Sequence, residues 1–106
     1  EIDDISVFER AGSEAGLKTP KRLLLMLGLS PKKETVLRLV DIICEHSMSY
    51  RYAHNIIDKK HHFLITHTLG IKWSKWFSSY LQSLFKSLLG LEIQIQEDDD
   101  SVSFAV

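Results

Sequence analysis

The chain has 106 residues, of which 44% are hydrophobic and 25% charged, with a formal net charge of −1. This length and balance are typical of one globular domain, and we expect 1–106 to be a single domain of a longer protein, because it does not begin with Met. The near-neutral total gives no electrostatic argument for nucleic acid or an anionic membrane, and no apolar run is long enough to span a bilayer. The single cysteine, Cys44, excludes an internal disulfide and indicates a reducing, cytoplasmic location.

Charge is nevertheless distributed unevenly along the chain. Residues 18–38 contain six basic side chains and one acid, Glu34, whereas residues 97–100 are four consecutive acids. The acidic run lacks the glycine and the spacing of a calcium-binding loop, so we interpret it as a solvated turn.

Three helical segments are predicted ahead of the first strand. Residues 3–15 form the first, and Gly16 ends it. Thr19-Pro20 is a helix-start signal for a short second segment. Ser30-Pro31 repeats that signal for a third segment, 31–46, which is apolar around more than half of its circumference and is therefore predicted to be a core helix.

Small residues cluster in the first of these segments, at Ala11, Gly12, Ala15 and Gly16. One interpretation is that they let a second backbone approach this helix closely. The other is that they are merely tolerated near a helix end. The sequence leaves both open.

Residues 50–57 and 62–69 alternate between apolar and polar side chains, which predicts a β-hairpin with a basic tip. A turn at Lys59-Lys60 would place Ile56 opposite Phe63. The face predicted to be inside then holds Tyr50, Tyr52, His54, Ile56, Phe63, Ile65, His67 and Leu69.

The stretch 71–90 has the clearest helical period, with a wide aromatic stripe and Gly90 at the expected C-terminal cap. A second alternating pair follows, 91–96 and 102–106, joined by the acidic loop so that Ile95 would face Val102. The predicted order is α-α-α-β-β-α-β-β. We therefore expect an α+β fold in which helices pack on one face of an antiparallel sheet made of two hairpins.

Three stretches resemble a known family when they are taken in order: Phe8 to Gly16, Gly28-Leu29-Ser30-Pro31, and Trp76 through Phe104. Together they are similar to the 4-vinyl-reductase-type (4VR) domain. The resemblance implies a small ligand-binding regulatory domain that is often dimeric beside a DNA-binding or enzymatic output. Many members hold zinc with cysteines on the last hairpin. This chain has no cysteine there, so the resemblance carries no zinc site over, and we expect no metal or cofactor.

The candidate ligand site lies between the aromatic helix and the inner hairpin face, where aromatic side chains can accept an apolar or aromatic molecule. The predicted ligand-binding residues are Tyr52, His54, Phe63, His67, Trp73, Trp76, Phe77 and Tyr80. The alternative for the aromatic stripe is core packing or a dimer seam.

The histidines and the cysteine are the remaining candidates for ligand binding or chemistry. His54 and His67 are predicted to be diagonal neighbours that grip a metal or a polar ligand group, or else two core histidines that each satisfy a neighbour. His61-His62 is interpreted as a solvated turn, and Cys44 as an inert buried thiol.

We expect a non-enzymatic module, because no nucleophile, phosphate-loop or paired-carboxylate motif is present. We interpret it as the sensory and dimerisation module of a regulatory protein, a transcription regulator. Its expected partners are the ligand and a second copy, with no direct nucleic-acid contact and no membrane span. One alternative is a winged-helix DNA-binding domain with Lys59 and Lys60 at the wing tip. The apolar segment 36–44 weighs against it, since a recognition helix must expose polar side chains. The other alternative is a ligand-free assembly module.

Overall fold

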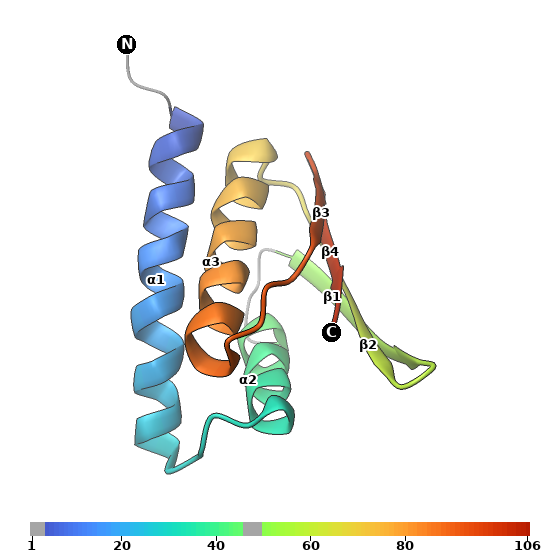
Figure 1. Ribbon diagram of the computed structural model, residues 1–106. Coiled ribbons are helices and arrows are strands. Elements are labelled where there is room, and N and C mark those ends of the chain that lie inside the picture. Colours follow the sequence, from blue (N-terminus) through green and yellow to red (C-terminus); the bar gives the residue numbers. More distant parts are fainter. Residues whose placement is uncertain (1–3, 46–49) are drawn as a thin grey trace.

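The computed structural model describes residues 4–45 and 50–106. Its elements are α1 (Asp4–Leu27), α2 (Lys33–Glu45), β1 (Tyr50–Ile57), β2 (Lys60–His67), α3 (Ile71–Leu89), β3 (Ile95–Asp98) and β4 (Ser101–Ala105). The four strands form one antiparallel sheet in the order β1-β2-β4-β3. α2 and α3 cover one face of this sheet, and α1 packs on α3 as an outer layer (Figure 1). The predicted α+β fold, with both hairpins in a single sheet, is confirmed.

The first two predicted helices are in fact one continuous helix, α1, which runs through Gly16 and keeps Pro20 in its interior. The expected break is therefore wrong. Gly16 acts as a packing position and not as a cap, and Pro20 is buried, so tertiary contacts outweigh the backbone hydrogen bond that proline cannot donate. The predicted helix ends at residues 3 and 46 lie outside the described residues.

The small residues of α1 let the backbone of α3 approach it closely. A Cβ atom on Gly12 would collide with the backbone oxygen of Trp76 and lie 2.9 Å from its carbonyl carbon. One on Gly16 would collide with the backbone oxygen of Tyr80 and lie 2.9 Å from Cβ of Ser83. Of the two interpretations, close backbone packing is the one observed at both glycines.

Two glycines end helices in the left-handed conformation that favours glycine. Gly28 (φ 68°) follows α1, and Gly90 (φ 65°) follows α3 as predicted. After α1, the N–H of Leu29 donates to the carbonyl of Leu24, five positions earlier, and the N–H of Gly28 donates to Leu25. After α3, the N–H of Gly90 donates to Lys86, four positions earlier, and that of Leu91 to Phe85. The first pattern is a Schellman motif, and the bond from Gly90 to Lys86 is that of the simpler left-handed cap; both satisfy carbonyls in the last turn of the helix.

α2 begins at Lys33, two residues later than predicted. The N–H of Lys32 is satisfied by the hydroxyl of Thr35, which also donates to backbone oxygens at the helix start. The buried residues of α2 are Val36, Leu37, Leu39, Val40 and Cys44. The prediction that this segment belongs to the core is confirmed, although its outer face carries exposed charges.

The first hairpin turns at Asp58 and Lys59, both with positive φ, one position earlier than expected. Its register is therefore shifted by two residues, so that Phe63 faces His54 and not Ile56. A shift of two keeps every side chain on its predicted face, and Phe63 and Ile65 are buried as expected.

The ends of this hairpin are less buried than predicted. Ile56 is exposed because the tip projects beyond the helices (Figure 1), and Leu69 lies past the end of β2 and is also exposed.

The second hairpin is also shifted by two residues, in the opposite direction. Its turn is Asp99-Asp100, and Ile95 pairs with Phe104 where Val102 was expected. β3 is correspondingly short, and residues 91–94 form no strand. Val102 and Phe104 still point into the core.

α3 supplies the centre of the core. Its inward side chains Phe77, Leu81, Leu84 and Phe85 are almost completely buried. They meet the inner sheet face, where the rings of Phe63 and Phe104 stack with centroids 4.8 Å apart. This packing holds α3 on the sheet beside α2 and so positions the site described next.

Candidate functional site

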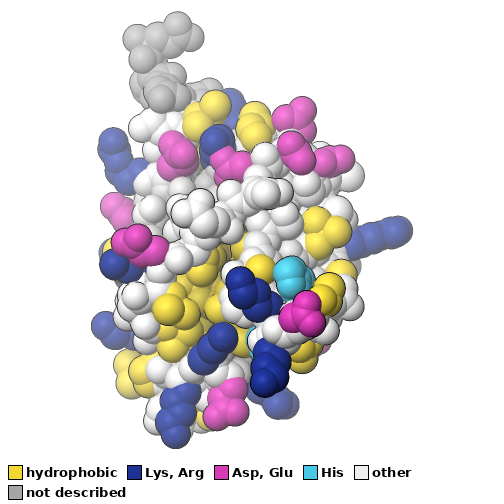
Figure 2. All heavy atoms as spheres, turned by 45° about the vertical axis from the view of Figure 1, so that its right-hand side comes forward, with side chains coloured by type: hydrophobic (Ala, Val, Ile, Leu, Met, Phe, Trp, Pro, Cys, Tyr) yellow, Lys and Arg dark blue, Asp and Glu magenta, His cyan; other side chains and the backbone are white. Residues whose placement is uncertain are grey.

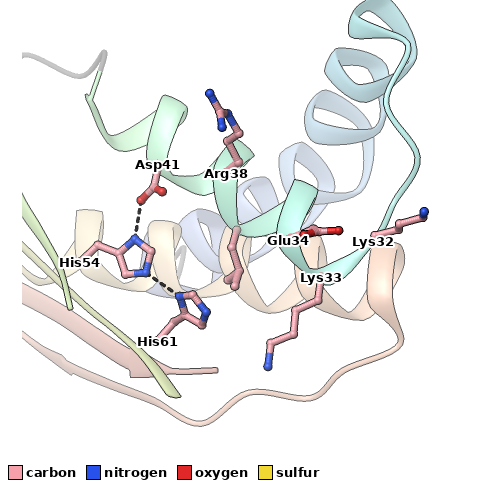
Figure 3. Close-up of a pocket in the computed structure, with 8 residues that line it drawn as sticks. Lys32, Lys33, Glu34, Arg38, Asp41, His54 and His61 are labelled. Carbon is pink, nitrogen blue, oxygen red and sulfur yellow. Dashed lines mark hydrogen bonds and ion pairs between the residues drawn. The ribbon is translucent and has the colours of Figure 1, made fainter. Parts of the chain in front are cut away.

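A hollow of about 490 Å³ lies between the start of α2 and the first hairpin (Figure 3). It is lined by Lys32, Lys33, Glu34, Leu37, Arg38, Asp41, His54 and His61. Seven of these eight side chains are polar or charged, and two are imidazoles. The α2 hollow, as we call it, is therefore a polar depression beside an apolar core.

A chain of hydrogen bonds crosses the floor of the α2 hollow. Asp41 Oδ1 lies 2.9 Å from His54 Nδ1, and His54 Nε2 lies 2.8 Å from His61 Nδ1. An ionised carboxylate only accepts, so His54 donates from Nδ1 to Asp41. With both rings neutral, His54 Nε2 then accepts from His61 Nδ1–H. The free nitrogen of His61, Nε2, is left with a lone pair and has no hydrogen-bond partner among the described residues.

The ring of His54 is held in place by more than hydrogen bonds. It stacks on the buried ring of Phe63 with centroids 4.1 Å apart and an interplanar angle of 18°. α2 supplies Asp41 on one side and β2 supplies Phe63 and His61 on the other. Rigid elements thus fix the orientation of a histidine pair whose outer end is open, which is the usual way to preorganise a binding or proton-transfer group.

Charges around the α2 hollow act on His61. Burial, His54 and the cation Lys33 lower the pKa of His61, while Asp41 opposes them. Lys33 extends toward the side of the hollow where His61 lies, whereas the guanidinium of Arg38 points away from the two rings (Figure 3). The free site therefore favours neutral His61, and an anion placed beside Lys33 would favour the protonated ring.

The prediction that His54 and His67 are neighbours is wrong. In the observed register His54 faces Phe63 and has His61 as its diagonal neighbour, whereas His67 pairs with residue 50 at the far end of the strands. The two-residue shift is the cause. His61, interpreted from sequence as a solvated turn residue, lies on the inner face within hydrogen-bond distance of His54. The signal that could have found it is Asp58, because aspartate tolerates the positive φ of a two-residue turn.

His67 is a satisfied core histidine. Its Nδ1 accepts from the N–H of Leu69 (3.1 Å), so its Nε2 donates to the hydroxyl of Ser74 (2.7 Å). Ser74 in turn donates to the backbone oxygen of Asp98 (2.6 Å). Burial lowers the pKa of His67, with Asp100 opposing. This chain ties α3 to both hairpins and leaves His67 no free nitrogen for a ligand.

Acid is expected to destabilise the fold through His67. Because burial lowers its pKa in the folded state below the ordinary 6.5, the unfolded chain takes up the proton first. The contribution is fully present above pH 6.5 and is lost as the pH falls from there toward the folded-state pKa. Urea unfolding on both sides of this window measures the effect. A free energy of unfolding that stays constant or rises on acidification would contradict it. His67→Gln should flatten the profile, leaving the contribution of His61, whose pKa is also lowered.

The eight predicted ligand-binding residues fall into two groups. Only His54 lines the α2 hollow. Trp73 stacks on Phe77 (4.9 Å) and Trp76 on Tyr80 (5.2 Å) along α3, and His67 contacts Trp73 (4.4 Å). These rings, with Phe63, pack on one another in and around the core. As a ligand-binding set the eight residues remain a prediction.

The described residues give little support for a metal site or a reactive thiol. In residues 4–45 and 50–106, no group of three or more His, Cys, Asp or Glu side chains is arranged to hold a metal ion. Cys44 is buried, and burial together with Asp41 and Glu45 raises its pKa to about 12, so the thiol stays protonated and unreactive.

No family model, curated protein or solved structure matches this chain. The 4VR resemblance therefore remains a prediction from sequence. In the described part of the chain, each helix is too short or too polar to cross a membrane.

Proposed function

We propose that this domain is a non-enzymatic regulatory module that binds a small organic acid in the α2 hollow. The observation that carries the proposal is His61 Nε2, an unpaired nitrogen at the open end of the fixed Asp41–His54–His61 chain. Lys33 lies beside it to attract a carboxylate, and Leu37 offers apolar surface for the body of the ligand. The transcription-regulator role and the homodimer remain predictions from sequence.

The polarity of the α2 hollow favours a ligand that carries an acid group over the uncharged apolar or aromatic molecule expected from sequence. Three cations and two carboxylates line it, and one of those carboxylates, Asp41, is already bonded to His54. A ligand carboxylate would accept from protonated His61 Nε2, and this charge-assisted bond is stronger than a neutral one. None of the lining residues carries a hydroxyl or thiol nucleophile, which favours binding over acyl transfer.

Binding and proton uptake are coupled in this proposal. Neutral His61 presents a lone pair and repels an anion, so the ligand enters together with a proton on Nε2. Affinity should therefore rise as the pH falls, by up to about tenfold per pH unit. Calorimetry of one carboxylate in two buffers of different ionisation enthalpy measures the protons taken up.

His61→Gln tests the site. Titration with a panel of aromatic and aliphatic carboxylates identifies a ligand for the unaltered chain, and the variant should bind it about tenfold or more weakly, because the charged donor is lost. His62→Gln is the matched control, since His62 is the next residue of β2 and lies on the opposite face of the sheet. Equal loss in both variants, or no binding of any carboxylate, would contradict the proposal.

A further inference from the structure

The end of α1 exposes a compact group of large apolar side chains. Leu25 and Met26 are 77% and 76% exposed, and Leu27 and Leu29 are 55% and 39% exposed. All lie at the junction of α1 with the loop to α2, at one pole of the molecule (Figure 1). We call these four residues the apolar tip. Four such neighbours are more than the scattered apolar residues that any surface carries.

Basic side chains surround the apolar tip. Lys18, Lys21 and Arg22 precede it on α1, and Lys32 and Lys33 follow it, all of them exposed. The only acid between residues 18 and 38 is Glu34. Figure 2 shows hydrophobic and basic side chains together over the lower part of this view, with acidic ones denser toward the top. The acidic turn Asp99-Asp100 belongs to that upper end (Figure 1).

We propose that this pole docks on an anionic lipid surface, with the apolar tip inserted among the acyl chains and the surrounding lysines and arginine at the headgroups. Apolar side chains that project between cations match the two layers of such an interface, which is polar and negative outside and apolar within. The near-neutral net charge does not oppose this, because only charges within about 10 Å of the lipid act on it at ordinary salt.

The apolar tip is what favours lipid over other anions. Nucleic acid or an acidic peptide would bind Lys21 and Arg22 but would leave Leu25 and Met26 exposed to water. A second copy of the chain would cover the leucines but would bring two basic poles together. Only a surface that is both anionic and apolar satisfies both sets of residues.

The experiment is co-sedimentation of the full chain with vesicles of equal parts phosphatidylcholine and phosphatidylserine. We expect retention that weakens with added salt and is lost on pure phosphatidylcholine. The double variant Leu25→Ser/Met26→Ser should lower the partition coefficient about tenfold or more. Its fold should be unaffected, because both side chains are exposed. Ile57→Ser/Leu64→Ser is the matched control, since these residues are 55% and 45% exposed on the sheet, far from the apolar tip.

The charges are tested in the same way. Lys21→Gln/Arg22→Gln should weaken retention, whereas Arg51→Gln/Lys60→Gln removes as much charge from the first hairpin and should not. Three outcomes overturn the proposal. The first is that the vesicles do not retain the chain. The second is that the Leu25→Ser/Met26→Ser variant is still retained and duplex DNA binds the chain equally well. The third is that the chain forms a dimer in sedimentation, which the same variant abolishes, and does not bind vesicles.

Discussion

Gly12→Ala is expected to lower the free energy of unfolding by about 3 kcal/mol or more, the largest effect of any single methyl group in this domain. The added Cβ would collide with the backbone oxygen of Trp76, and neither backbone can yield without moving a whole helix. In an ordinary helix the same change stabilises by about 1 kcal/mol, so the sign itself is diagnostic. Urea unfolding followed by circular dichroism and by fluorescence of the two tryptophans measures the loss.

Two further variants sharpen this test. Gly16→Ala should act in the same direction, because its Cβ meets Tyr80 and Ser83 of the same helix, α3. Ala11→Met is the control, since Ala11 is exposed on α1 next to Gly12 and its substitution should change stability by no more than about 0.5 kcal/mol. If Gly12→Ala proves neutral or stabilising, the close approach of α1 and α3 is refuted.

Ser74→Ala is expected to destabilise by about 2–3 kcal/mol, although it removes a single oxygen atom. That hydroxyl accepts from His67 and donates to the backbone oxygen of Asp98, so its loss leaves two polar groups without their partner. His67 is buried, and water cannot readily take the place of the hydroxyl. Chemical denaturation gives the cost, and the pKa of His67, followed by NMR, should shift in the variant, which a loss of packing alone would not produce.

The matched control for Ser74 lies one turn further along α3. Ser78 is also buried, yet its hydroxyl has no hydrogen-bond partner among the described residues. Ser78→Ala should therefore be neutral or slightly stabilising, because it removes a buried polar group that gains nothing from the fold. Equal costs for the two substitutions would show that helix packing, and not the His67–Ser74–Asp98 chain, accounts for the effect.

Much of the fold could be predicted because its signals are local. The 3.6-residue period of 71–90 and the left-handed cap at Gly90 identify α3 without reference to the rest of the chain. Alternation in the two hairpins likewise predicts which side chains face inward, and Phe63 and Val102 are buried as expected. The period of a helix or a half-buried strand is visible directly in the order of its apolar and polar residues.

The candidate site could not be predicted, because it depends on register. A turn at Lys59-Lys60 and one at Asp58-Lys59 give the same inner face, so alternation cannot distinguish them. They nevertheless place different residues beside His54, and the observed one brings His61 to it. Asp41 comes from α2, thirteen positions away from His54, and joins it only after the helix packs on the hairpin.

The amino-acid sequence by itself determined the class of fold, the inner face of each hairpin and the cap of the aromatic helix, because those follow from periodicity and backbone chemistry within about twenty residues. The tertiary structure alone decided that α1 continues through Gly16 and Pro20, that both hairpins shift by two residues, and that Asp41, His54 and His61 meet. For each of these outcomes, the local sequence either allowed an alternative structure equally well or favoured a different one. Packing against α3 and pairing of β2 with β4 selected among them, since contacts between distant segments exceed the small free-energy differences between local alternatives.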